Sequence, residues 1–157
     1  MHLNVGEVNV TDWDPPDPRE RSDLGPGDIE LRLSADLVNL PIVRSVVATI
    51  ATRADFDLDA IADLRLAVDE ACSTLITRAV PGTVMTCRLT VSGDALCFTG
   101  DVQSATGTEP STKSFGWRVL TTLTDMVNSR VSSNGQHYEL NIELAKRRAV
   151  EVPGAGV

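Results

Sequence analysis

The chain has 157 residues, about the size of one domain, and 42% of them are hydrophobic, which is enough to bury a core. Its 14 basic and 22 acidic side chains give a formal charge of −8, which argues against direct nucleic-acid binding because that requires clustered lysine and arginine. No apolar run reaches the roughly 20 residues of a membrane span, and no charged-then-apolar leader opens the chain. We therefore expect a cytoplasmic protein without a membrane partner.

The first 28 residues have the composition of a disordered acidic arm. Residues 1–28 hold half of the eight prolines and seven acidic side chains, and they show no repeating apolar period. The folded domain is expected over residues 29–145, and residues 146–157 form a polar tail that is expected to fray.

The next segments predict a strand and two helices. Apolar and polar residues alternate over 29–33, as in a half-buried strand. The first helix is expected to begin after Asn39, a plausible N-cap, with Pro41 in its first turn. The second is expected to start at a cap formed by Asp57 or Asp59 and to end before a Pro-Gly pair. Its core-facing stripe consists of Ile61, Leu64, Val68, Cys72, Leu75 and Ala79.

The second half of the domain predicts two hairpins and a third helix. Strands are expected over 83–91 and 95–99, followed by an irregular loop over 102–115 that is rich in Ser, Thr, Gly and Pro. A helix should follow Gly116 and run to about Asn128, before a second hairpin. This order predicts an α+β fold: a two-layer sandwich with a mixed or antiparallel sheet and helices on one face.

The cysteines and histidines indicate neither a disulfide nor a metal site. Cys72, Cys87 and Cys97 each lie in an apolar-patterned segment and form no CxxC pair, so buried free thiols are expected. His2 and His137 are too few and too far apart to form a metal site with them.

A carboxylate on the second helix raises the question of function. At 100° per residue, Glu70 lies opposite the core stripe, with Thr74 one turn further on the same face. A solvated surface is the ordinary interpretation of a lone glutamate in this position. Leu66 and Ile76 make this face partly apolar, which is typical of the wall of a pocket.

Three motifs in a fixed order resemble a known superfamily. They are "LRLAVDEACSTLITRAV" in the second helix, "GDVQSA" after the hairpin and "SFGWRVLTTLTDMV" at the third helix. The chain over 29–145 resembles the anti-sigma factor branch of the GHKL ATPase and histidine-kinase-like superfamily, and in particular its actinobacterial anti-sigma-F type. The resemblance implies a GHKL (Bergerat) ATPase fold, with ATP and Mg²⁺ as cofactors.

The resemblance also implies roles for single residues. Glu70 matches the catalytic glutamate, a general base on the hydroxyl of the protein substrate. Thr74 matches the Mg²⁺-binding asparagine, although a hydroxyl replaces the amide carbonyl that hard cations favour. Asp101 matches the aspartate that binds the adenine amino group. Gly116 matches the last glycine of the phosphate loop, at a helix N-terminus.

The sequence departs from the family pattern where the nucleotide would bind. The glycines that should follow the adenine-binding aspartate are replaced by Val102, Gln103 and Ser104, and Phe115 stands in place of a companion glycine. These departures, together with Thr74, fall on residues that hold ATP and Mg²⁺. They favour a protein that works by binding rather than by phosphate transfer.

Three functions are therefore compared at the level of the sequence. By resemblance, the first is an anti-sigma factor that sequesters an alternative sigma factor of the stress or sporulation type. STAS-domain anti-anti-sigma proteins would release it, it would act as a homodimer, and Arg44 on the first helix would contact the sigma factor. The second is an active ATP- and Mg²⁺-dependent serine protein kinase that phosphorylates this antagonist. The third is a small-ligand α+β domain without affinity for a sigma factor.

Overall fold

Five antiparallel strands form a single sheet in the computed structural model, which describes residues 24–149. The strand order is β1-β2-β3-β5-β4. The strands are β1 (Ile29–Ser34), β2 (Val84–Ser92), β3 (Ala95–Ser104), β4 (Met126–Ser133) and β5 (Tyr138–Arg147). All neighbouring strands in this order are hydrogen-bonded in antiparallel register.

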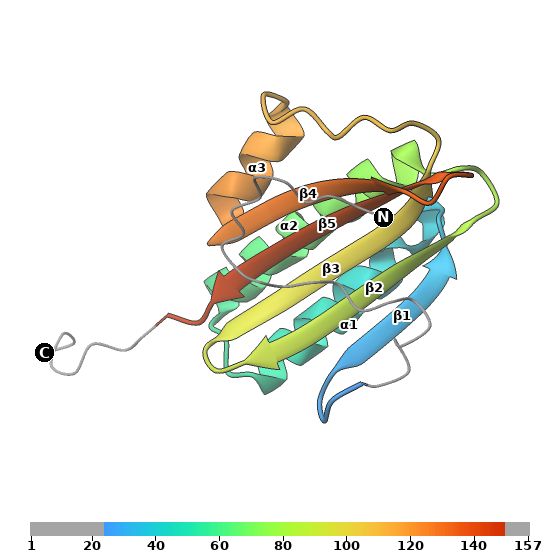
Figure 1. Ribbon diagram of the computed structural model, residues 1–157. Coiled ribbons are helices and arrows are strands. Elements are labelled where there is room, and N and C mark those ends of the chain that lie inside the picture. The colour runs from blue at the N-terminus through green and yellow to red at the C-terminus, as the bar shows by residue number, and fades with distance from the viewer. Residues whose placement is uncertain (1–23, 150–157) are drawn as a thin grey trace, which may run out of the picture.

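The helices lie on one face of this sheet (Figure 1). They are the short 3-10 helix η1 (Leu37–Asn39) and the α-helices α1 (Leu40–Arg53), α2 (Leu58–Arg78) and α3 (Phe115–Leu123). In Figure 1, α1 and α2 run behind the strands, and α3 lies at the β4 edge. The predicted α+β sandwich with helices on one face is confirmed. No helix in the described part of the chain is long and apolar enough to cross a membrane.

The core lies between α2 and the central strands. Leu64, Val68 and Leu75 of α2 are fully buried, as the predicted stripe requires, and Phe98 of β3 is buried opposite them. A Cβ atom added to Gly100 of β3 would lie 2.6 Å from Cδ1 of Leu75. The helix therefore rests directly on the sheet, at a position where only glycine leaves room.

Side-chain caps begin two of the α-helices, and for α2 the cap is one of the two predicted residues. The carboxylate of Asp57 accepts a hydrogen bond from the Ala60 amide (2.8 Å), so Asp57 is the cap of α2. Ser114 caps α3 by accepting from the Trp117 amide (3.1 Å). Asn39 precedes α1 but makes no side-chain cap bond. Its amide group donates to the Ser34 carbonyl instead (2.9 Å), because η1 occupies the turn before α1.

Two predicted boundaries were wrong. The strand predicted over 95–99 continues to Ser104, because Gly100 and the polar residues after it pair with β5 rather than turning. The third helix was expected to reach Asn128, but it ends at Leu123, and β4 begins at Met126. Val127 continues the helical apolar stripe of α3, yet it also fits the period of a strand, and pairing with Leu144 of β5 decides the outcome.

The described residues begin within the expected arm and end within the expected tail. Residues 1–23 of the predicted arm and residues 150–157 of the predicted tail lie outside the described residues. Within the arm, Asp28 accepts a hydrogen bond from the Gly25 amide (3.0 Å) and forms an ion pair with Arg88 of β2 (3.9 Å). At the other end, Lys146 and Arg147 belong to β5 rather than to a frayed tail.

The buried thiols follow the prediction for two of the three cysteines. Cys72 of α2 and Cys87 of β2 are fully buried and unpaired, whereas Cys97 is half-buried. Contact with the Cys87 thiol and burial raise the pKa of Cys72 well above its ordinary value. Because the thiolate is the reactive form, the raised pKa and full burial both disfavour reaction at Cys72.

Candidate functional site

The part of α2 that carries Glu70 is partly covered by α3, which packs along it. Glu70 and Thr74 are both half-buried. A Cβ atom added to Gly116, the second residue of α3, would overlap Oε1 of Glu70 and would lie 3.1 Å from Cδ of the same carboxylate. The structure therefore brings Glu70 and Gly116 together at the first turn of α3.

The loop over 105–114 is tied to the C-terminal end of α2. The guanidinium of Arg78 donates to the Thr108 carbonyl (3.0 Å), and the Ala105 amide donates to the Arg78 carbonyl (3.1 Å). Thr74 lies between this anchor and Glu70, and its carbonyl accepts from the Thr77 hydroxyl (3.1 Å). Thr74, Glu70 and Gly116 thus lie in one region between α2, α3 and the loop.

Asp101 lies on the opposite face of the sheet from this region. In β3 the buried side chains that face the helices alternate with side chains on the other face, and Leu75 of α2 contacts Gly100. Asp101 follows Gly100 and therefore points away from α2. It accepts a hydrogen bond from the Asn141 side chain of β5 (2.8 Å). The next residue that faces α2 is Val102, which is 2% exposed and apolar.

The structure places the residues of the expected site in two separate regions. The predicted adenine ligand, Asp101, and the predicted catalytic base, Glu70, do not line one pocket. A shift of one residue in a strand moves a side chain to the other face, and the motif alone did not reveal on which face Asp101 lies. The Glu70 carboxylate lies against Gly116, the expected phosphate-loop position, and a negative charge there disfavours a phosphate. The arrangement of Glu70, Gly116 and Asp101 therefore does not fit ATP and Mg²⁺, in line with the departures of the sequence from the family motifs.

A second feature is a pocket on the outer side of α1 and α2. Its volume is about 300 Å³, and it is lined by Arg44, Ala62, Arg65, Leu66 and Asp69. Nε of Arg44 lies 3.3 Å from Oδ1 of Asp69, and both atoms are inaccessible to solvent although the side chains are partly exposed. Leu66 is 59% exposed. The pocket thus combines an exposed apolar side chain with two arginines and one carboxylate.

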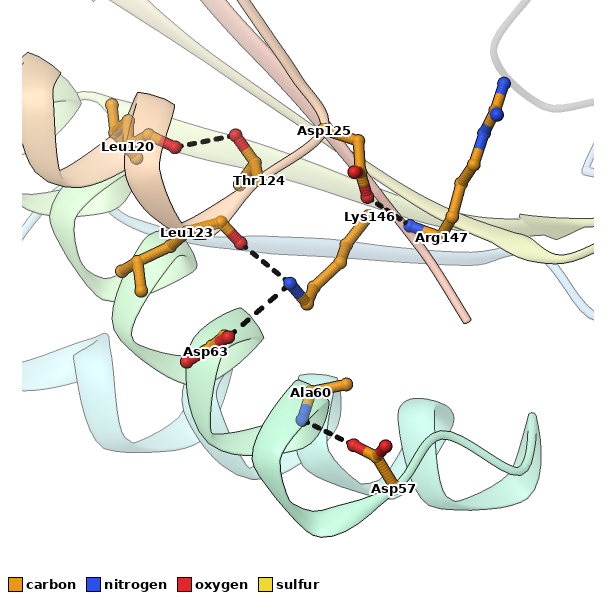
Figure 2. Close-up of polar contacts among 9 residues, drawn as sticks. All are labelled: Asp57, Ala60, Asp63, Leu120, Leu123, Thr124, Asp125, Lys146 and Arg147. Atoms are coloured by element: carbon orange, nitrogen blue, oxygen red, sulfur yellow. Dashed lines mark hydrogen bonds and ion pairs between the residues drawn. The ribbon is translucent and has the colours of Figure 1, made fainter. Parts of the chain in front are cut away.

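The sequence analysis missed the contribution of Lys146, because it assigned this residue to the tail. Figure 2 shows the Lys146 ammonium group between the end of α3 and α2. It donates to the carbonyl of Leu123, the last residue of α3 (3.1 Å), and pairs with Asp63 of α2 (3.5 Å). The apolar-polar alternation of β5 continues through this position, and that signal could have extended the predicted strand.

Comparison with known proteins gives consistent matches. The model of the histidine kinase-like ATPase domain matches residues 33–142. Two curated proteins of Mycobacterium tuberculosis, from strains CDC 1551 / Oshkosh and ATCC 25618 / H37Rv, are each 40% identical over 119 residues. Both are named anti-sigma-F factor RsbW, and each match covers 71% of this chain and 67% of the relative.

A solved structure has the same fold. The crystal structure of the RsbU and RsbW domains of a Mycobacterium tuberculosis protein matches with a TM-score of 0.58 and 14% sequence identity. The match covers 80% of this chain and 33% of that chain, so the present protein spans about a third of the solved one. At this identity the likeness concerns the fold alone.

Proposed function

We propose, since the chain belongs to the histidine kinase-like ATPase family, that it is an anti-sigma factor which binds an alternative sigma factor and hides its RNA polymerase surface. The observation that carries this proposal is the 40% identity to two proteins named anti-sigma-F factor RsbW, over more than two thirds of the chain. Such a protein acts in the cytoplasm, where transcription takes place.

The pocket between α1 and α2 supports a contact surface around Arg44. Arg44 and Arg65 outnumber the single carboxylate, Asp69, so the pocket favours an acidic side chain of the partner. The exposed Leu66 beside them offers apolar area to the same partner. We therefore assign the sigma factor to this outer side of the helix layer.

The proposal also covers the release of the sigma factor and the oligomeric state of the chain. A STAS-domain anti-anti-sigma protein would compete for the chain and free the sigma factor, and the working unit would be a homodimer. A kinase activity with ATP and Mg²⁺ is not favoured, because Asp101 and Glu70 lie on opposite sides of the sheet and Glu70 contacts Gly116. Sequestration does not require the nucleotide.

The proposal is tested by titrating the purified protein with a purified sigma factor of the sigma-F type from the same organism. We expect saturable binding, and a loss of at least about tenfold in affinity for Arg65→Ala and Arg44→Ala, as for residues at the centre of an interface. Isothermal titration measures the affinity of the wild type and of both variants. Absence of binding by the wild type would contradict the proposal.

The matched control is Arg53→Ala. Arg53 lies on α1, as Arg44 does, but in its exposed last turn and away from the pocket lining. Its substitution removes the same charge from the same helix and should leave the affinity unchanged. Equal losses for Arg53→Ala and Arg65→Ala would indicate a general charge effect and would remove the pocket from the proposal.

A further inference from the structure

The contact between Glu70 and Gly116 goes beyond the proposed function, because it concerns the place where the family would hold a nucleotide phosphate. The first amides of an α-helix have no partner within the helix and carry partial positive charge. In α3, the Trp117 amide is satisfied by the Ser114 hydroxyl. The Glu70 carboxylate lies directly against the neighbouring residue, Gly116, within the same first turn.

The other end of α3 has the opposite charge beside it. Lys146 donates to the carbonyl of Leu123, at the negative end of the helix dipole, and is itself paired with Asp63 of α2 (Figure 2). Asp63 and Glu70 are seven residues apart on α2, and Gly116 and Leu123 are seven residues apart on α3. At 1.5 Å per residue both spacings are about 10.5 Å. The two helices therefore match in antiparallel register, with one acidic residue of α2 near each end of α3.

From this arrangement we infer that Glu70 is a built-in anion for the N-terminus of α3, which fastens this helix onto α2 and excludes a nucleotide phosphate from the same position. Glu70 is then a positioning residue and not a catalytic base. The missing side chain of Gly116 leaves room for the carboxylate, and a side chain at this position would displace the end of Glu70. The departures from the family pattern at Thr74 and after Asp101 agree with a site that no longer needs to bind Mg²⁺ or adenine.

The inference predicts an energetic coupling between Glu70 and Gly116, which a double-mutant cycle measures by urea unfolding. Alanine is a better helix former than glycine, so Gly116→Ala in a Glu70→Ala background should raise the folding equilibrium constant about two- to fivefold. In the wild type the same substitution displaces the carboxylate, and we expect no gain or a loss. Glu70→Gln alone should lower the constant by about two- to fivefold, because it removes the charge and keeps the shape.

Thr122→Ala provides the matched control. Thr122 is exposed on α3, and its hydroxyl bonds within the helix to the Arg118 carbonyl (2.8 Å). Its substitution also raises helix propensity but adds no atom near Glu70. The effect of Thr122→Ala should be the same with and without Glu70. If Gly116→Ala also has the same effect with and without Glu70, the two residues are not coupled and the built-in anion is ruled out.

A second readout addresses the nucleotide directly. Isothermal titration of the wild type with ATP and Mg²⁺ should give no binding heat, and the fluorescence of Trp117, measured in a Trp13→Phe background, should not change. Micromolar, Mg²⁺-dependent binding by the wild type would overturn the inference. Neither readout involves the sigma factor, so failure of the proposed function would leave both results intact.

Discussion

Three carboxylates of this chain, Glu70, Asp101 and Glu143, lie in different environments. Glu70 is half-buried against the backbone of Gly116, and Asp101 accepts a hydrogen bond from Asn141 on the far side of the sheet. Glu143, on β5, is also half-buried, and its burial raises its pKa above the ordinary value, with a smaller opposing effect of Arg130. For each of them the environment, and not the residue type, decides the role.

The raised pKa of Glu143 predicts a stability that falls with rising pH. Between the ordinary pKa of glutamate, about 4.3, and the raised value in the fold, the folded state holds more protons than the unfolded state. Folding stability therefore decreases as the pH rises through this window. Glu143→Gln should accordingly be more stable than the wild type at pH 7, and the difference should shrink toward pH 4. Urea midpoints at both pH values measure it.

The control for this prediction is Glu109→Gln, in the exposed loop before α3. It removes one negative charge without changing a half-buried side chain, so it corrects for the effect of net charge. A Glu143→Gln protein that is less stable than the wild type at pH 7 would show that the carboxylate stabilises the fold when ionised.

At the scale of elements, α3 depends on its neighbours. It has nine residues, fewer than the roughly 12 to 15 that an isolated helix needs in water. Only Leu120 of this helix is fully buried. Contacts at its two ends, with Glu70 and with Lys146, therefore supply part of what holds it in place.

Lys146→Ala tests the contact at the C-terminal end. It removes the hydrogen bond to Leu123 and the ion pair to Asp63, and Lys146 is only 17% exposed. We expect a loss of about 1–2 kcal/mol in unfolding free energy, measured by urea denaturation. Arg147→Ala is the control: Arg147 is exposed, and its contact to Asp125 uses the backbone amide, which alanine retains. Similar losses for both variants would contradict a specific role of Lys146.

For the whole molecule, the spacing between the helix layer and the sheet sets the positions of both surfaces discussed above. α2 rests on β3 through the contact of Leu75 with Gly100. The same helix carries Glu70 toward α3, and Arg65 and Leu66 toward the pocket. A change in the height of α2 above the sheet would therefore move the candidate partner surface and the α3 contact together.

Gly100→Ala should cost about 1–3 kcal/mol of unfolding free energy, because the added methyl overlaps a fully buried side chain. In a Leu75→Ala background the same methyl fills part of a cavity, so the cost should vanish or change sign. Thermal and urea unfolding of the wild type, the two single variants and the double variant give the unfolding free energies of this cycle. Thr99→Ala, on the other face of β3, serves as the comparison. An equal cost of Gly100→Ala in both backgrounds would show that the backbone of β3, and not Leu75, resists the change.

Much of the fold could be predicted, because its signals are local. The alternation of β2, the apolar stripe of α2 and its cap Asp57 involve residues within a few positions of one another. The end of α3 could not be predicted this way, since residues around Val127 suit both a helix and a strand. Of the site, the family motifs selected Glu70, Gly116 and Asp101 as single residues, but neither the contact of Glu70 with Gly116 nor the face on which Asp101 lies could be read from them, because both depend on packing between distant segments.

The sequence by itself determined an α+β domain, its helix starts and the half-exposed face that carries Glu70, because periodicity and capping depend on neighbouring residues. Only the tertiary structure decided that α3 covers this face, that Lys146 joins α3 to α2, and that Asp101 points to the other side of the sheet. These outcomes depend on strand register and helix packing between distant segments, and a single-residue shift in register reverses the face on which a side chain lies.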